Sequence, residues 1–251
     1  MGLFNRIRNR NHIDEEDIVH QLYNDYISVA YNTALLSETR ARTRINPDEY
    51  IRNDKKILDI FSNAQSMDAE LGLNVGTRFT ADYAEATKKA IEDAEKQLGP
   101  QCDADPAFVY RQAKNNEQMF HVLADCYLLC SLFAAAIDEM DDPAEKAGYI
   151  EASDDLLVFA EYIEIQLALH QSEQEYIADH VMDYINNDCK DVESIANYIC
   201  EDFNIFYDFM DDFLEGKQEM KNINQLELQE SIYDIDKIFA DSLNYHEKEA
   251  H

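Results

Sequence analysis

The sequence predicts an all-α protein, a multi-helix bundle of about eight helices, several of them long. Only six Gly and four Pro occur in 251 residues, whereas sheets joined by tight turns need more of both residues. Three of the four prolines follow Asn or Asp. At a helix start an Asx side chain accepts free N–H groups, and Pro gives up an N–H that has no partner. Apolar residues also recur at helical spacing over long stretches.

The Asx-Pro pairs and the glycines set the boundaries of the expected helices. Helix starts are expected at Asn46-Pro47, Asp105-Pro106 and Asp142-Pro143. Ser172 and Glu175 have the spacing of a capping box at another start. The expected helices cover, in order, about 14–43, 47–71, 81–98, 106–140, 143–171, 173–187, 192–215 and 225–245. Leu73–Phe79 is the only candidate for an extended segment.

The length of 251 residues allows one large domain or two small ones. We expect a single helical domain over 1–251, preceded at its start by a basic segment over 1–12. If there are two subdomains, 1–99 and 106–251, the loop Gly99–Asp105 is the best candidate for their boundary.

The clearest apolar periodicity lies between residues 192 and 213. Its members are Val192, Ala196, Ile199, Phe203, Phe206, Met210 and Phe213. Their alternating steps of four and three residues form a heptad seam. The last expected helix has the same pattern, with Leu228, Ile232, Ile235, Phe239 and Leu243 on one face. We interpret the seam as packing within the bundle, with docking of a partner helix or of another copy as the alternative.

Charge is divided unevenly along the chain. Residues 1–56 hold nine basic and nine acidic residues, so the formal charge of −31 comes entirely from residues 57–251. The first ten residues contain Arg6, Arg8 and Arg10 and no acid. A strongly acidic body with a short basic start indicates the charge of the partners that the protein can bind. It does not indicate a reaction that the protein catalyses.

Five cysteines, an odd number, match no disulfide framework and predict reduced thiols in a cytoplasmic protein. Four acidic residues, Asp14 to Asp17, precede any apolar stretch. A signal peptide has an apolar stretch directly after its basic start, so none is expected here. The longest apolar run, Val122–Ile137, is interrupted by Asp125 and is shorter than the roughly 20 residues needed to span a bilayer. We therefore expect a buried core helix there and no membrane span.

One polar stripe is the best candidate for chemistry. One side of the helix expected over 106–140 carries Lys114, Glu117, His121 and Asp125. His121 and Asp125 are four residues apart. That spacing suits an acid–base pair or two metal ligands. We interpret it as an internal ion pair or hydrogen bond. No Glu-x-x-His pair of the di-iron type is present in the sequence, and we assign no catalytic residue, metal ligand or cofactor.

These features favour a non-enzymatic helical interaction or assembly protein with an acidic surface. It would associate with itself or form part of a larger, phage-like assembly. The expected interaction surface comprises Arg6, Arg8, Arg10, Glu201, Asp202, Asp208, Asp211, Asp212 and Glu215. The partner is then another copy or a basic protein. Direct binding of nucleic acid by the acidic body is not expected, because like charges repel.

Two alternatives stay open. The first is an acidic inhibitor, a nucleic-acid mimic or immunity-type protein, that covers a basic site, since carboxylates in rows on rigid helices can imitate phosphates. The second is an enzyme of unrecognised type that uses His121 and Asp125, or the pair Glu161 and Glu164.

Overall fold

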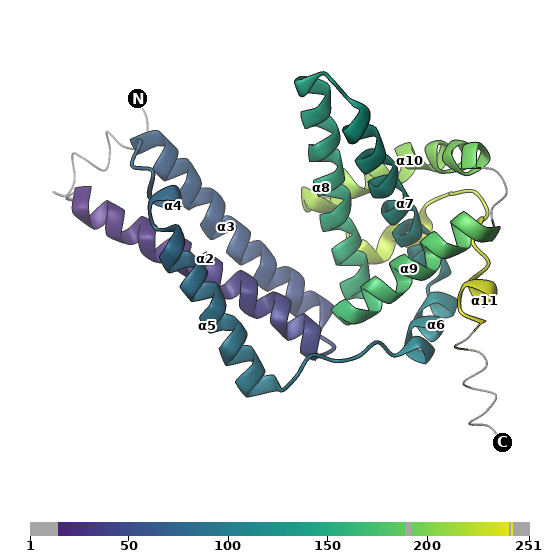
Figure 1. The fold of residues 1–251 in the computed structure, drawn as a ribbon, viewed down its shortest axis with the longest axis horizontal. Helices are drawn as coiled ribbons and strands as arrows, with labels where there is room; N and C mark the ends of the chain where they lie inside the picture. Colours follow the sequence, from purple (N-terminus) through teal and green to yellow (C-terminus); the bar gives the residue numbers. More distant parts are fainter. Residues whose placement is uncertain (1–14, 189–191, 241, 243–251) are drawn as a thin grey trace. The chain divides into compact units, whose positions relative to one another are not determined.

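The computed structural model describes residues 15–188, 192–240 and 242 (Figure 1). All regular secondary structure in these residues is helical, so the all-α prediction is confirmed for them. Arg6, Arg8 and Arg10, with the rest of the basic segment 1–12, lie outside the described residues. The chain divides into two compact units, Met1–Gln101 and Cys102–His251, which we call unit 1 and unit 2. The expectation of a single domain, with two subdomains as its alternative, stays a prediction.

Unit 1 is built from three long helices. They are α2 (Glu15–Arg42), α3 (Pro47–Leu71) and α5 (Thr80–Leu98), with the short α4 (Val75–Arg78) between the last two. Helix α2 packs along α5 and also against α3 (Figure 1). Leu22, Tyr26, Ala64 and Val75 form the buried centre of this packing.

Tyrosines on α2 join it to both neighbours. The Tyr23 hydroxyl donates to Asp82 over 3.2 Å and the Tyr31 hydroxyl donates to Asp93 over 2.9 Å, which ties α2 to α5. The Tyr26 hydroxyl donates to Asp68 of α3 over 3.4 Å. Because these bonds are spread along α2, they fix its register against both partner helices.

The start of α4 corrects one expectation from the sequence. Leu73–Phe79, the one candidate for an extended segment, is not extended throughout, because residues 75–78 are helical. The two carboxylate oxygens of Asp68 accept the N–H groups of Val75, at 3.0 Å, and of Gly76, at 2.8 Å. A side chain from the preceding helix therefore satisfies free N–H groups that a local cap would otherwise take.

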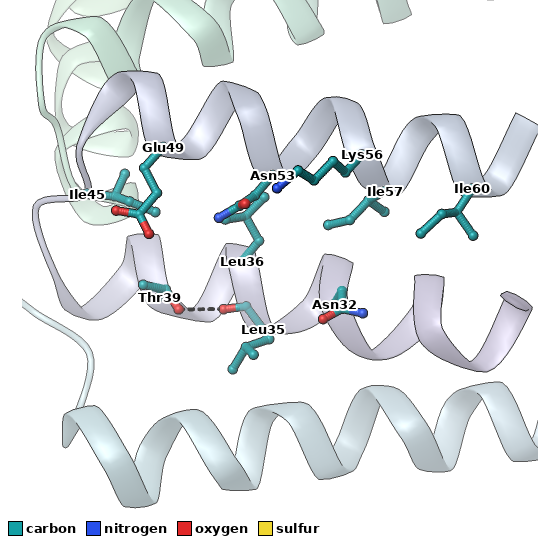
Figure 2. A pocket seen from close by; sticks show the side chains of 10 residues that line it. All are labelled: Asn32, Leu35, Leu36, Thr39, Ile45, Glu49, Asn53, Lys56, Ile57 and Ile60. Carbon is teal, nitrogen blue, oxygen red and sulfur yellow. Dashed lines mark hydrogen bonds between the residues drawn. The ribbon is translucent and has the colours of Figure 1, made fainter. Parts of the chain in front are cut away.

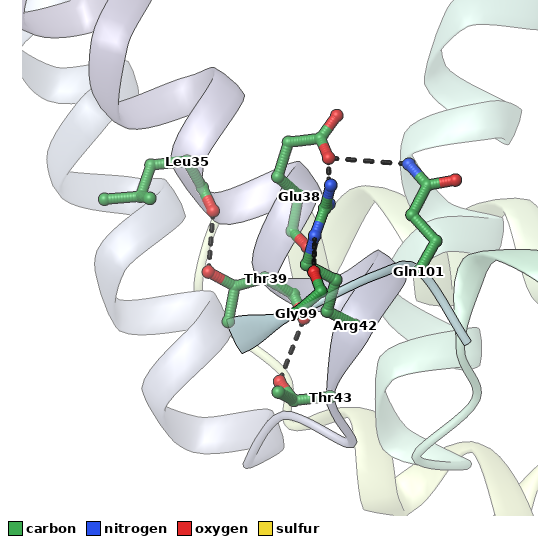
Figure 3. Close-up of polar contacts among 7 residues, drawn as sticks. All are labelled: Leu35, Glu38, Thr39, Arg42, Thr43, Gly99 and Gln101. Atoms are coloured by element: carbon green, nitrogen blue, oxygen red, sulfur yellow. Dashed lines mark hydrogen bonds and ion pairs between the residues drawn. The ribbon is translucent and has the colours of Figure 1, made fainter. Parts of the chain in front are cut away.

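Arg42 closes the other end of unit 1 (Figure 3). Its Nε donates to the carbonyl of Gly99 over 2.8 Å, and its Nη1 donates to the backbone carbonyl of Glu38 over 3.2 Å. Arg42 also forms an ion pair with the Glu38 side chain. Arg40 and Arg42 are both buried. Arg40 and Arg42 therefore belong to the packing of unit 1 and are not available to bind a partner.

Unit 2 contains five α-helices longer than one turn and two short elements among its described residues. They are α6 (Pro106–Asn115), α7 (Glu117–Glu139), α8 (Pro143–Gln166), α9 (Gln171–Asp188), α10 (Val192–Leu214), the 3₁₀ helix η1 (Met220–Gln225) and α11 (Ile235–Ile238). Helices α7 and α8 pack side by side, and α10 crosses them (Figure 1). The first half of α7, from Met119 to Leu129, is buried on all sides.

Three local expectations in unit 2 are corrected. The helix expected over 106–140 is interrupted at Asn116, which separates α6 from α7. The helix expected over 225–245 is wrong, because residues 226–234 are not helical and α11 is one turn long. The box expected at Ser172 and Glu175 is replaced by Glu173, whose carboxylate accepts the N–H of His170 over 2.8 Å.

Glu173 also links two helix starts. It is fully buried, and its second oxygen accepts the N–H of Asp105 over 3.1 Å. The side chain of Asp105 in turn accepts the N–H groups of Ala107 and Phe108 at the start of α6. One buried carboxylate thus positions α6 against α9.

Among the described residues one helix, α7, has the length and composition of a membrane-crossing helix. More than half of its apolar window, 56%, is buried inside the protein. Core helices of folded domains have the same composition, so this feature by itself is weak evidence for a membrane segment.

Candidate functional site

The heptad seam of α10 packs into the core of unit 2. Its members Ile199, Phe206, Met210 and Phe213 are buried. The ring of Phe213 meets those of Phe159 and Tyr162 on α8, with centroids 6.0 and 5.2 Å apart. The side chains of Val192 and Ala196 lie outside the described part of the chain.

The opposite side of α10 is acidic and exposed. Its exposed acids are Glu201, Asp208, Asp211, Asp212 and Glu215. Asp202 does not belong with them, because only 1% of it is exposed. Its expected place on the interaction surface is therefore corrected. Lys217 pairs with Glu215, and with Asp212 over 3.7 Å, so the C-terminal end of this side is partly neutralised.

Acids of α8 extend this surface where it meets α10. Burial and the charges of Glu151, Asp211 and Asp154 raise the pKa of the Asp155 carboxyl. Burial, Asp211, Asp155 and Glu151 likewise raise the pKa of the Tyr207 hydroxyl. We call Glu151, Asp154, Asp155 and Asp211 the acidic face. No Lys or Arg in the described ranges forms an ion pair with these four.

The α8 half of the acidic face was missed by sequence reasoning. The spacing of Glu151, Asp154 and Asp155 is visible in the sequence and places them near one another on a helix. That they meet Asp211 depends on the crossing of α8 and α10, which no local pattern encodes.

His121 and Asp125 form the buried pair that their spacing predicts. His121 Nε2 lies 3.1 Å from Asp125 Oδ2, and the two side chains are 2% and 0% exposed. Tyr233, from the non-helical segment after η1, donates its hydroxyl to Asp125 Oδ1 over 2.8 Å. Its ring stands edge-on to that of His121, with centroids 5.9 Å apart. The pair is therefore a buried contact within ion-pair distance, and its Asp125 also binds a third side chain, Tyr233.

Asp202 anchors the same non-helical segment from α10. We call residues 226–234 the strap. The backbone N–H of Gln229 donates to Asp202 Oδ2 over 3.0 Å, and it lies 3.1 Å from Oδ1. Burial raises the pKa of the Asp202 carboxyl, while the Gln229 N–H and the neighbouring His121 lower it. Two buried carboxylates, Asp125 and Asp202, thus fasten the strap to α7 and α10.

A cavity of about 600 Å³ opens beside the His121–Asp125 pair. It is lined by Glu117, Gln118, His121, Leu228, Gln229, Glu230, Ser231 and Tyr233. Glu117 thus lies near His121 as predicted. Lys114 does not join them, because it lies on α6 and pairs with Asp236 over 3.2 Å. His121 is turned to Asp125 and almost fully buried, so the arrangement favours anchoring over acid–base exchange with a ligand.

The other residues considered for chemistry have separate surroundings. Glu164 is buried and accepts a hydrogen bond from the hydroxyl of Tyr127, whereas Glu161 is partly exposed. Burial raises the pKa of the Cys126 thiol well above its ordinary value, as for a small buried apolar residue. Within the described ranges no three His, Cys, Asp or Glu residues are grouped to hold a metal ion.

Unit 1 has a hollow of its own, about 450 Å³, between α2 and α3. Leu35 and Leu36 of α2 and Ile57 and Ile60 of α3 are among the residues that line it (Figure 2). Its charged lining residues, Glu49 and Lys56, have opposite signs. The hollow is mainly apolar and has no evident preference for a charged ligand.

The acidic face and the strap anchor are the two arrangements that set unit 2 apart. The first is exposed except for the half-buried Asp155, and all its charges have the same sign. The second is buried, and its partners belong to the protein itself.

Comparison with protein-family models, with curated proteins and with solved structures gives no match that would place this chain in a family.

Proposed function

We propose that the chain is a non-enzymatic interaction protein whose unit 2 binds a basic protein surface, another copy of the chain being the first candidate. The acidic face, together with the other exposed acids of α10, is the observation that carries this proposal. Residues 102–251 hold 35 acidic and eight basic residues, a formal charge of −27. The apolar side of α10 is buried, so its acids stand on a fixed scaffold.

Repulsion within the acidic face supports the same function. Burial raises the pKa of Asp155 most, and the charges of Glu151, Asp211 and Asp154 raise it further, so repulsion contributes to disfavouring its charged form. A cationic partner would relieve this repulsion when it binds. The relief would contribute to the binding free energy in addition to any apolar contact. Charge of one sign on a surface also steers a partner of the opposite sign towards it.

The acidic inhibitor is the second candidate, favoured by the spacing on α10. Asp208, Asp212 and Glu215 follow one another at four and three residues and are all exposed. Successive carboxylates are then about 4.5–6 Å apart along a rigid helix. Such a row resembles the regular charges of a nucleic-acid strand and suits a basic site that binds one.

Self-association at two salt concentrations tests the first candidate. We expect light scattering to show oligomers at about 0.01 M salt that dissociate at about 1 M, where the Debye length falls from about 30 Å to about 3 Å. Replacing Asp208, Asp211 and Asp212 together by Asn should weaken the association about tenfold at low salt. A strict monomer at high concentration and low salt would overturn self-association.

A control variant separates this surface from total charge. Glu175, Asp179 and Asp183 are exposed on α9 at steps of four residues. Replacing them by Gln, Asn and Asn removes the same charge from another helix. This variant should keep more of the association than the α10 variant does. Salt-sensitive capture of basic nucleases by a monomeric chain would instead favour the inhibitor.

A further inference from the structure

Helix α8 exposes apolar side chains beside the acidic face. Ile150, Leu157 and Val158 are 44%, 47% and 40% exposed. Ile150 and Leu157 are seven residues apart, so they lie on one side of the helix, with Asp154 between them. Large apolar residues this exposed on one helix face are typical of a surface that a partner covers.

The charges around these residues define what the partner must offer. Glu151 and Asp154 are exposed among the apolar side chains, and Asp155 adjoins them. A complementary segment therefore combines apolar side chains with positive charge and contains no acid. A segment without charge would leave the carboxylates desolvated and unpaired, which disfavours binding.

The chain itself contains one such segment. Residues 1–10, with the sequence MGLFNRIRNR, hold three arginines, three large apolar residues after the initial Met, and no acid. The apolar residues are Leu3, Phe4 and Ile7. The other arginine-rich stretch without acids follows Thr39, but its Arg40 and Arg42 are buried within unit 1. Residues 1–10 are therefore the better match in composition.

We propose that the exposed side of α8 formed by Ile150, Leu157 and Val158, with Glu151 and Asp154, docks residues 1–10 of a second copy of the chain. This inference rests on the proposed function and names both surfaces of the contact. Copies associate head to tail, so each copy offers one basic segment and one α8 surface. Apolar burial supplies affinity and the acids select a basic segment.

A peptide-binding experiment tests the docking surface. The probe is the synthetic peptide MGLFNRIRNR with a fluorescent label, titrated with the chain lacking residues 2–10 and followed by anisotropy. We expect saturable binding at low salt. Leu157→Ser should weaken it about fivefold, because less apolar surface is then buried. A peptide with Ser at positions 3, 4 and 7 should bind still more weakly.

Leu58→Ser is the matched control. Leu58 is 48% exposed on α3 of unit 1, almost the same as Leu157, and its replacement should leave peptide binding unchanged. If both Leu variants bind like the unaltered chain, the α8 surface is overturned, while salt-sensitive self-association would still support the proposed function. If light scattering shows that the full chain stays monomeric at every concentration, residues 1–10 do not dock on a second copy, and that part of the proposal is overturned.

Discussion

At the residue scale, two glycines carry opposite predictions. A Cβ at Gly76 would lie 3.0 Å from Cζ and Oη of Tyr26, whose ring is buried in unit 1. Gly76→Ala should therefore lower the free energy of unfolding by about 1–2 kcal/mol, because the ring must shift. Gly148 lies inside α8 with open space around the same position. Gly148→Ala should raise the free energy of unfolding by about 0.5–1 kcal/mol.

Urea unfolding followed by circular dichroism measures both changes. The pair controls for helix propensity, since Ala is the better helix former at each position. Stabilisation by both substitutions would contradict the close approach of Gly76 to Tyr26.

Residue spacing could have separated Asp202 from the other acids of α10. At 100° per residue, Asp202 lies about 70° from the centre of the heptad seam, whereas Glu201, Asp208 and Asp211 lie about 110° or more away. The spacing of the residues could therefore have predicted that Asp202 is buried. The spacing could not have predicted the hydrogen-bond partner of Asp202, because the N–H of Gln229 lies 27 residues further along the chain.

At the scale of elements, helix starts were predictable where capping is local. Asn46, Asp105 and Asp142 all accept N–H groups from the first turn that follows, as their Asx-Pro pairs predict. The break at Asn116 was not predictable in this way, because its side chain bonds back to Gln112 and caps no N–H of α7.

The strap shows why the expected C-terminal helix failed. Its apolar residues recur at helical spacing, but Gln229 and Tyr233 are bound by Asp202 and Asp125 from other helices. These tertiary contacts outweigh a weak local preference for helix. The position of His121 near Asp125 was predictable from their spacing, whereas the third partner, Tyr233, is 108 residues from Asp125.

Removal of one hydroxyl tests how firmly the strap is held. Tyr233→Phe should lower the free energy of unfolding by about 1.5–3 kcal/mol, because a bond to a buried carboxylate is lost. Tyr110→Phe is the control, since it removes an equally short bond, 2.7 Å, to the exposed Asp236. It should have a much smaller effect. Hydrogen exchange at the amide of Gln229 should accelerate in the first variant, and equal effects of both would contradict an anchoring role.

At the scale of the whole molecule, the two units differ in charge. Residues 1–101 hold 17 acidic and 13 basic residues, a formal charge of −4, whereas residues 102–251 carry −27. Self-repulsion of like charges destabilises a compact state and is screened by salt. Unit 2 should therefore gain more stability from added salt than unit 1 does.

The raised pKa values give this asymmetry a pH dependence with a definite sign. Asp155 and Asp202 hold their protons to higher pH in the folded protein than the ordinary value of 3.8. As pH rises above that value the unfolded chain releases these protons first, so the stability of unit 2 falls until both folded groups have ionised. The pKa of Asp236 is lowered by its bonds to Tyr110 and Lys114, so its contribution is lost only as pH falls below the same value. Unit 2 should consequently be more stable at about pH 5 than at about pH 7.

Hydrogen exchange with mass spectrometry can check both effects, because it measures peptides of each unit separately. After correction for intrinsic rates, peptides from α7, α8 and α10 should gain protection at about pH 5 and at about 1 M salt, and those from α2, α3 and α5 should gain much less.

Asp155→Asn should remove part of the pH dependence, because it removes one of the two groups with a raised pKa. Asp179→Asn deletes the same charge from the exposed side of α9 and should leave the pH dependence in place. Equal gains in both units, or a loss of protection in α8 at about pH 5, would show that repulsion at the acidic face does not control the stability of unit 2.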